Sequence, residues 1–153
     1  MEDKKEYFMN EALKQAEKAY KKLEVPVGAI IVKDGKIISR AYNQKEAKKS
    51  VVKHAEIIAI EKACKKIDNW RLNDCEMYVT LEPCPMCAGA IMNSRIKKLY
   101  IGTMEEKSGA CGSKVNLLQD YNFETKVEVE NNIKNSECEK ILKNFFKEIR
   151  KNK

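Results

Sequence analysis

The segment MYVTLEPCPMCAGAIMNS, residues 77–94, joins a strand to a helix and decides the class of fold. Residues 77–80 are typical of a short strand. Residues 83–94 are typical of a helix, because proline is tolerated in a first turn, where its missing N–H needs no partner. Strand and helix meet at Glu82-Pro83-Cys84. Strands that alternate with helices in this way predict a sheet with a parallel portion joined by right-handed crossovers.

The rest of the chain alternates between helical and strand periodicity. Apolar residues recur at steps of three and four in three other stretches, and two runs rich in valine or isoleucine flank Asp34-Gly35, a strong hairpin signal. The predicted helices cover residues 5–23, 55–67, 83–94 and 136–151, and the predicted strands cover residues 27–33, 36–42, 77–80, 98–102 and 125–129. This order predicts an α/β fold, a three-layer α/β/α sandwich with a mixed central sheet, in one domain spanning residues 1–153.

Two further local expectations concern the second half of the chain. Residues 105–113 contain glycines and are expected to form a loop. The residues expected to face inward from the last helix are Ile141, Leu142, Phe145, Phe146 and Ile149. Because Phe145 and Phe146 are adjacent, at most one is expected in the core, and the other is available to a partner or a splayed base.

Composition excludes several classes of protein. The 153 residues suit one domain, and a hydrophobic fraction of 43% excludes a disordered chain. The longest apolar run, residues 25–32, is far shorter than the roughly 20 residues that a membrane helix needs, so no membrane partner is expected. The start of the chain lacks a secretory signal, so we expect a reducing cytoplasm, in which six unevenly spaced cysteines do not predict disulfides.

The net charge of +7 is compatible with a polyanionic partner. It is weak evidence alone, because 26 of the 30 basic residues are lysine and only four are arginine, the residue that binds phosphate through two hydrogen bonds. Two local clusters are more informative: residues 45–53 carry four lysines against one glutamate, and residues 140–153 carry six basic residues against one. Most of these side chains are expected to be solvated, but as a set they could follow a phosphate backbone.

Three residues that can bind zinc, together with a carboxylate, stand at the starts of two of the helices. His54 and Glu56 stand where one helix begins, and Cys84 and Cys87 stand at the start of another. The cysteines are three residues apart, so they share a helix face near the positive end of the helix dipole, which favours thiolates. Three protein ligands leave a fourth position for water, as in catalytic zinc sites, and Glu56 is then the candidate proton shuttle.

Spacing alone leaves alternatives open. His54 and Glu56 are two residues apart, about 200° around a regular helix, so the sequence does not show that both face one metal. Taken by itself, a Cys-x-x-Cys pair is more often a redox pair or half of a structural zinc site. A non-catalytic zinc or redox protein, with Cys111 as a fourth ligand, is therefore one rival interpretation.

Several blocks of the chain are similar to one family. His54-Ala55-Glu56 and TLEPCPMCAGA at residues 80–90 resemble the zinc-dependent deaminases of the cytidine and deoxycytidylate deaminase superfamily. Within it, the chain resembles the bacterial tRNA-specific adenosine deaminases nearly end to end. The blocks that carry this likeness are residues 24–29 (EVPVGA), Asn43, residues 69–72 (NWRL), residues 78–90, residues 94–96 (SRI), residues 107–113 (KSGACGS) and the Phe145-Phe146 helix.

This resemblance implies a function and a set of site residues. The implied reaction is hydrolytic deamination of the wobble adenosine of a tRNA anticodon to inosine by zinc-activated hydroxide, in a cytidine deaminase-like fold. The implied metal is one Zn²⁺ per subunit on His54, Cys84 and Cys87, with no other cofactor. Glu56 is implied as the proton shuttle, and the protein as a cytoplasmic homodimer acting on a tRNA anticodon stem-loop. The implied substrate-binding residues are Asn43, Pro26, Val27, Ala55, Glu105, Lys107, Phe145 and Arg150.

Two departures from the family pattern bear on the flanking nucleotides. Glu105 stands where the family often carries aspartate, and residues 50–53, SVVK, replace a common proline and a small residue or threonine. Asn43 also suits a turn after a strand, and Pro26 and Val27 also suit a strand start. The rival enzymatic interpretation is a guanine or cytosine deaminase that acts on free bases with the same zinc site.

Overall fold

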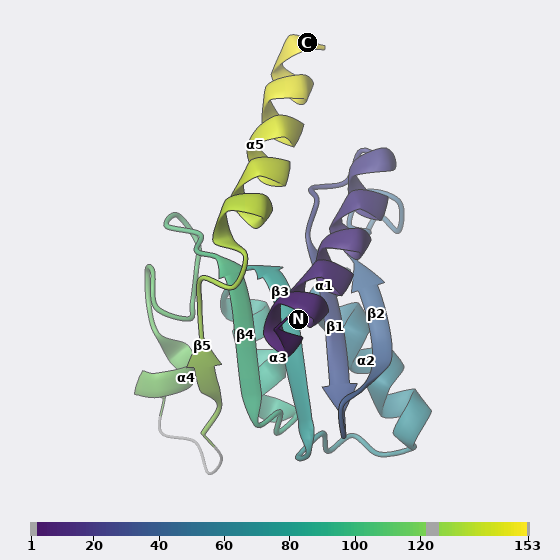
Figure 1. Cartoon of the computed structure of the whole chain (residues 1–153), viewed down its shortest axis with the longest axis vertical. Coiled ribbons are helices and arrows are strands. Elements are labelled where there is room, and N and C mark those ends of the chain that lie inside the picture. Colours follow the sequence, from purple (N-terminus) through teal and green to yellow (C-terminus); the bar gives the residue numbers. More distant parts are fainter. Residues whose placement is uncertain (1–2, 122–125, 153) are drawn as a thin grey trace.

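The computed structural model describes residues 3–121 and 126–152 and confirms the predicted three-layer α/β/α arrangement (Figure 1). Its strands form one mixed sheet in the order β2-β1-β3-β4-β5. The strands are β1 (Gly28–Lys33), β2 (Lys36–Tyr42), β3 (Cys75–Leu81), β4 (Lys98–Thr103) and β5 (Glu128–Glu130). β1 pairs antiparallel with both β2 and β3, whereas β3, β4 and β5 run parallel, as the alternation of strands and helices predicts.

Helices cover both faces of the sheet (Figure 1). They are α1 (Lys4–Lys21), α2 (Ala55–Ile67), α3 (Pro85–Asn93), α4 (Leu117–Asp120) and α5 (Asn135–Lys151). Successive side chains of a strand point to opposite faces. Ile30 and Val32 of β1 therefore pack with α1 and α5, whereas Ala29 and Ile31 join the larger core beneath α2, α3 and α4.

The observed bounds agree with most of the predicted ones. α2 spans the predicted residues, and the hairpin turns at Asp34-Gly35 between β1 and β2. α3 begins at Pro85 rather than at Pro83, so the proline in its first turn is the one that follows Cys84. β5 lies at Glu128–Glu130 instead of residues 125–129, and Thr125 itself is outside the described residues. α4 was not predicted, because four residues are too few to show helical periodicity.

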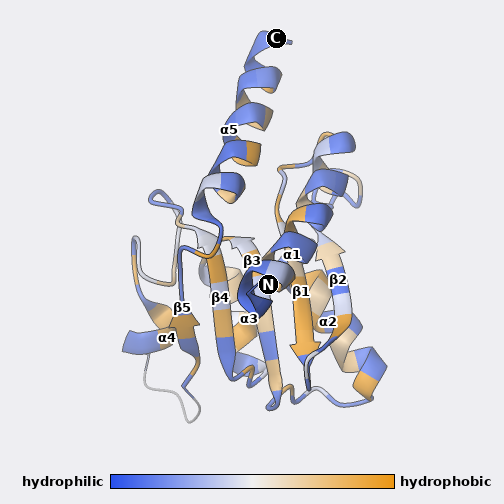
Figure 2. Ribbon diagram, viewed as in Figure 1, coloured by the Kyte–Doolittle hydropathy of each residue, from blue (hydrophilic) through white to orange (hydrophobic). Residues whose placement is uncertain are grey.

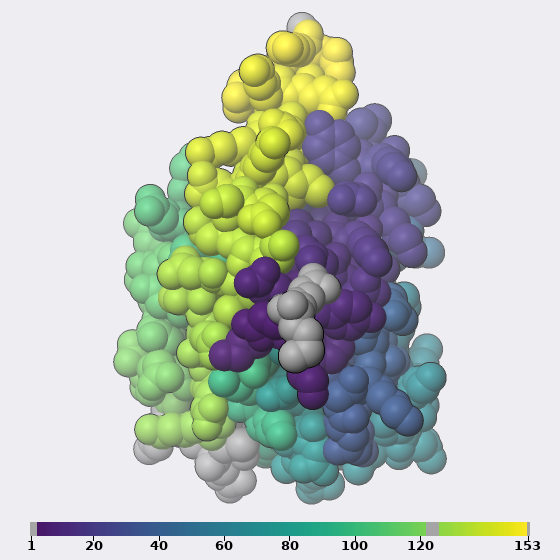
Figure 3. All heavy atoms as spheres, in the orientation of Figure 1, coloured from purple at the N-terminus to yellow at the C-terminus, as the bar shows by residue number. Residues whose placement is uncertain are grey.

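The predicted inward face of α5 is only partly correct. Phe145 is 3% exposed and packs edge-on against the ring of Tyr20 in α1, with ring centroids 5.4 Å apart. Phe146 is 44% exposed. Neighbouring residues on a helix point about 100° apart, so only one of the two phenylalanines can face α1. α5 lies against α1 and extends beyond the sheet, where its surface is largely hydrophilic (Figures 1, 2 and 3).

Gly28 permits the close approach of α1 to β1. A Cβ atom at Gly28 would overlap the backbone oxygen of Ala12 and lie 2.6 Å from the backbone nitrogen of Ala16. Neither is a flexible side chain, so we expect Gly28→Ala to lower the free energy of unfolding by about 3 kcal/mol, as severe overpacking does. Urea unfolding would measure this change. Gly89→Ala is the control, because a Cβ atom there has open space and should be neutral or slightly stabilising; equal midpoints for the two variants would contradict the prediction.

No helix within the described residues is both long enough and apolar enough to cross a membrane.

Candidate metal centre

His54 and Cys84 occupy equivalent positions, each at the N-cap of a helix. His54 precedes α2 and Cys84 precedes α3, and both have extended backbones, with φ and ψ of −77° and 154° and of −76° and 174° respectively. Because β1 is antiparallel to both β2 and β3, those two strands point the same way, and the helices that follow them begin at one end of the sheet. The topology therefore joins residues that lie 30 positions apart in the chain.

The ligand atoms of His54, Cys84 and Cys87 lie within 4.8 Å of one another. His54 Nδ1 is 3.7 Å from Cys84 Sγ and 3.4 Å from Cys87 Sγ. Tetrahedral zinc with bonds of about 2.3 Å to sulfur and 2.0–2.1 Å to nitrogen separates such atoms by about 3.6 Å. The donor set and its spacing thus fit zinc, and the predicted triad forms a metal-binding cluster consistent with zinc deaminases.

The two cysteines differ in their readiness to ionise. A hydrogen bond from the Cys87 thiol, and a further one from His54, lower the pKa of Cys84 to about 4. The same sharing of one proton raises the pKa of Cys87, which is fully buried. Hydrogen bonding to Cys84 also raises the pKa of His54. A cation bound at this cluster would displace the remaining thiol proton, because metal ligation requires thiolates.

Glu56 lies beside this cluster without belonging to it. Its side chain is 4% exposed, and its charge interacts with His54 and Cys84. Since His54 stands outside the helix with an extended backbone, the 200° separation expected within a regular helix does not apply to the pair. Burial raises the pKa of Glu56 to about 7. A carboxyl group with that pKa can both accept and release a proton near neutral pH.

A pocket of about 190 Å³ opens beside the cluster. Its lining includes five of the predicted substrate or shuttle residues: Val27, Asn43, Ala55, Glu56 and Glu105. Five residues that were not predicted as site residues also line the pocket: Val25, Lys45, Leu81, Glu82 and Ser108. Leu81 and Glu82 lie within three residues of Cys84, so their closeness in the sequence to a predicted ligand could have identified them. Val25 and Ser108 lie on loops within the family-like blocks 24–29 and 107–113, and Lys45 lies in the basic cluster 45–53, but nothing in the sequence singled these residues out within those stretches.

Asn43 faces the pocket but is already engaged with its own loop. Its Nδ2 donates to the carbonyl oxygen of Val25 at 3.2 Å, and its Oδ1 accepts from the backbone N–H of Lys45 at 3.2 Å. Asn43 therefore stabilises the turn after β2, as its residue type also suggested. An amide group has four hydrogen-bonding positions, so both Asn43 atoms keep capacity for a ligand.

The other predicted substrate residues lie outside this pocket. Pro26 is buried and does not line it, and Phe145 is enclosed between α1 and α5. Lys107 and Arg150 line a neighbouring open groove of about 1010 Å³, which shares Val25, Leu81 and Glu105 with the pocket. Phe146, exposed on α5, lines that groove where the buried Phe145 does not.

Cys111 does not complete a four-cysteine or mixed structural zinc site. Among the described residues, the only cluster of three or more metal-binding side chains is His54, Cys84 and Cys87. Burial raises the pKa of Cys111 to about 12. By its position among the described residues, Cys111 is not part of the cluster.

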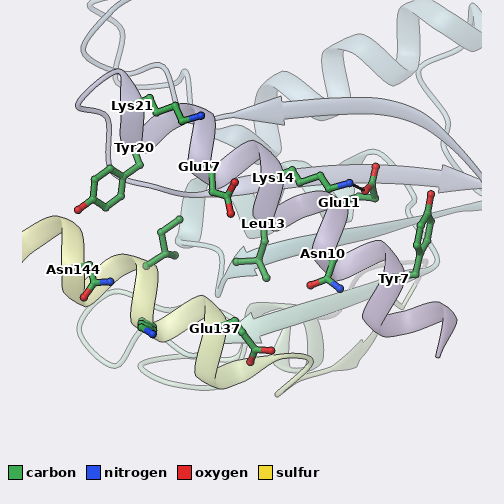
Figure 4. Close-up of a pocket in the computed structure, with 12 residues that line it drawn as sticks. Tyr7, Asn10, Glu11, Leu13, Lys14, Glu17, Tyr20, Lys21, Glu137 and Asn144 are labelled. Atoms are coloured by element: carbon green, nitrogen blue, oxygen red, sulfur yellow. Dashed lines mark ion pairs between the residues drawn. The ribbon is translucent and has the colours of Figure 1, made fainter. Parts of the chain in front are cut away.

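A separate groove of about 740 Å³ runs between α1 and α5 (Figure 4). Leu13 and Ile141 contribute to its lining, together with the ion pair between Lys14 Nζ and Glu11 Oε2 at 2.6 Å. None of the residues predicted for metal, substrate or proton transfer lines it. It is thus distinct from the metal centre.

Comparison with known proteins places this site in a family. The sequence profile of the MafB19-like deaminases matches residues 2–150. The tRNA-specific adenosine deaminase of Bacillus subtilis (strain 168) is 46% identical over 148 residues, 97% of this chain and 92% of that protein. A solved structure from studies of A-to-I editing by tRNA:A34 deaminases at the wobble position of transfer RNA has a TM-score of 0.86 and 40% identity, over 89% of this chain and 99% of that one. The guanine deaminase structure from Bacillus subtilis has a TM-score of 0.65 and 32% identity, over 80% and 82%. The chain therefore belongs to the MafB19-like deaminases, and among them to the tRNA-specific adenosine deaminases.

Proposed function

We propose that this protein converts the wobble adenosine of a tRNA anticodon to inosine by zinc-dependent hydrolysis. The observation that carries the proposal is the juxtaposition of a three-ligand cluster with a buried carboxyl group in one pocket. Identity of 46% to a tRNA-specific adenosine deaminase, against 32% to a guanine deaminase over a shorter span, favours the RNA substrate.

His54, Cys84 and Cys87 would hold one Zn²⁺ per subunit, whose Lewis acidity lowers the pKa of a water to about 7. The burial of Glu56 in the same pocket supports its role as the group that would accept a proton from the attacking water and deliver it to the substrate. The water oxygen bonds to the adenine carbon that bears the amino group, and the bond from that carbon to the amino nitrogen breaks. One water proton leaves with ammonia, and the other remains on the ring of the product base.

The walls of the pocket supply positions for the base and its sugar. Val25, Val27 and Leu81 are apolar, which suits the faces of an adenine ring. Asn43 keeps free hydrogen-bonding capacity beside them. Glu105 also lines the pocket, so its extra methylene relative to aspartate affects the nucleotide contacts rather than the proton transfer at Glu56.

The open groove beside the pocket offers a path for the RNA backbone. Its basic side chains lie on α5 and on the loop after β4: Lys107, Lys143, Lys147 and Arg150. Phe146 presents an exposed aromatic ring among them, and splayed RNA bases stack on such rings. The combination favours Phe146 over the buried Phe145 as the aromatic contact.

Neutralising this groove should weaken RNA binding without removing the metal. We expect Lys147→Gln with Arg150→Gln to lower affinity for an anticodon stem-loop and to reduce by about two the slope of log affinity against log salt, because two phosphate contacts are lost. Fluorescence anisotropy at several salt concentrations measures both. Lys65→Gln with Lys66→Gln, at the exposed end of α2, is the charge-matched control, and equal effects of the two pairs would contradict a defined RNA path.

The assembly and location follow from the same proposal. We propose a cytoplasmic homodimer formed from a single domain, since a composite RNA surface is more easily built from two copies than from one small domain. Light scattering after size-exclusion chromatography measures the mass of the particle. A monomer at working concentration, with full activity, would remove the dimer from the proposal.

The decisive test is the product. Incubation with tRNA transcripts, followed by sequencing of the anticodons, should reveal inosine at the wobble position. The same preparation should leave free guanine, cytosine and cytidine unchanged. Turnover of a free base without any editing of tRNA would replace this proposal with the free-base alternative.

A further inference from the structure

Two buried glutamates hold the loops that line the metal pocket. Glu24 is 1% exposed and Glu82 is 2% exposed. A buried carboxylate needs strong hydrogen bonds, because leaving it unpaired is very costly. Both satisfy this need with backbone N–H groups of loops that are distant in the sequence.

Glu82 holds the loop that follows β4. Its Oε1 accepts from the backbone N–H of Glu105 at 2.9 Å and from the hydroxyl of Ser113. Its Oε2 accepts from the backbone N–H groups of Cys111 and Ser113, both at 3.0 Å. The loop passes so close that a Cβ atom at Gly109 would overlap the Glu82 carboxyl group. One carboxylate thus fixes the loop that brings Glu105 and Ser108 to the pocket and Lys107 to the groove.

Glu24 holds the loop that connects β2 to α2. Its Oε1 accepts from the backbone N–H of Glu46 at 2.9 Å, and its Oε2 accepts from that of Ala47 at 2.7 Å. Asn43 accepts from the preceding N–H, that of Lys45, so three consecutive donors are satisfied together. This loop supplies Asn43 and Lys45 to the pocket and leads directly to His54.

We propose that Glu24 and Glu82 are positioning residues for the deamination, which fix the two loops that hold the substrate nucleotide. This inference rests on the proposed function and extends it to residues outside the reacting groups. Glu82 lines the pocket, yet each of its oxygens already accepts two hydrogen bonds, the full capacity of a carboxylate. It therefore has no free lone pair for a proton in transfer, and its role is to order the loop.

Glutamine at each position keeps the size of the side chain and changes its hydrogen bonding. In Glu82→Gln, an NH₂ group faces two donors, so two hydrogen bonds are lost. In Glu24→Gln, the amide oxygen keeps one partner and one hydrogen bond is lost. We expect KM for an anticodon stem-loop to rise at least about tenfold in Glu82→Gln and about threefold in Glu24→Gln. Since the loops bind substrate and do not transfer protons, kcat should stay within about threefold.

Two further readouts separate positioning from general destabilisation. Zinc content should equal that of the unchanged protein in both variants. Hydrogen–deuterium exchange should accelerate at residues 105–113 in Glu82→Gln and at residues 45–47 in Glu24→Gln, each without the other. Glu76→Gln is the control. Glu76 lies in β3, the strand that leads to Glu82, and accepts a hydrogen bond of 3.5 Å from the Tyr100 hydroxyl. This substitution should leave KM and both loops unchanged.

The inference is overturned if KM in the two variants stays within about twofold of the unchanged protein, or if Glu76→Gln raises KM equally. If Glu82→Gln does not fold, Ser113→Ala takes its place, because it removes one donor and keeps the carboxylate. A KM rise of about threefold in Ser113→Ala supports the inference, and an unchanged KM overturns it. Editing of tRNA by the unchanged protein tests the proposed function separately, and loop exchange is measured without any substrate.

Discussion

Glu56→Ala is expected to retain zinc and to lose deamination of the tRNA substrate by at least about 10²-fold in kcat, the scale of a positioned proton transfer. The metal should stay because Glu56 is outside the ligand cluster formed by His54, Cys84 and Cys87. The reaction should slow because burial beside that cluster raises the pKa of Glu56 to about 7, whereas the neighbouring Glu82 already accepts four hydrogen bonds. Metal analysis and single-turnover kinetics on an anticodon stem-loop measure the two effects.

The matched control for Glu56→Ala lies on the same helix. Glu61 of α2 is exposed and forms an ion pair with Lys53 at 3.2 Å. It belongs neither to the ligand cluster nor to the lining of the pocket. Glu61→Ala should keep both zinc and activity, because an exposed ion pair contributes little. Full activity in Glu56→Ala would remove Glu56 from the mechanism, and loss of zinc in that variant would assign it a structural part in the metal site.

His54→Ala is expected to abolish both stable zinc binding and deamination. Only two sulfur ligands would remain, and three protein ligands are the usual minimum of a catalytic zinc site. The variant should keep its fold, since His54 is partly exposed and precedes α2 without capping it through a side-chain hydrogen bond. Zinc content and circular dichroism would be measured together. A variant that retains one equivalent of zinc would show that the cluster is not the metal site.

Because this chain has a single histidine, zinc binding to His54 can also be observed directly by NMR spectroscopy. His54 directs Nδ1 toward both sulfur atoms, so zinc should bind that nitrogen and leave the proton on Nε2. Adding zinc to metal-free protein should therefore shift the ¹⁵N signals of one imidazole ring, with Nδ1 as the metal-bound atom. Signals that do not respond to one equivalent of zinc would contradict the assignment of His54 as a ligand.

Local patterns in the sequence predicted most of the elements. The bounds of α2 and the turn at Asp34-Gly35 follow from apolar spacing and turn chemistry, which depend only on neighbours in the chain. The prediction failed where the pattern was short or ambiguous, as for α4 and the start of β5. It was correct that at most one of Phe145 and Phe146 is in the core, but helical spacing permitted either, and the position of α1 selected Phe145.

The candidate site divides in the same way. The zinc-binding residue types, the spacing of Cys84 and Cys87 and the carboxylate of Glu56 were visible in the sequence. The spacing was informative because positions three residues apart share a helix face. Pocket residues on loops, such as Val25 and Ser108, carried no periodic signal. Loop residues are positioned by contacts distant in sequence, and no local rule specifies those contacts.

By itself, then, the sequence determined most of the helices and strands, the ligand types and their order, since each depends on side chains a few residues apart. Only the tertiary structure decided that His54 meets Cys84 and Cys87, because that meeting requires β2 and β3 to point the same way on either side of β1. Burial within that arrangement raised the pKa of Glu56 to about 7. It also placed Glu24 and Glu82 within reach of backbone N–H groups from remote loops, and Glu82 within reach of the Ser113 hydroxyl, which stabilise these buried carboxylates.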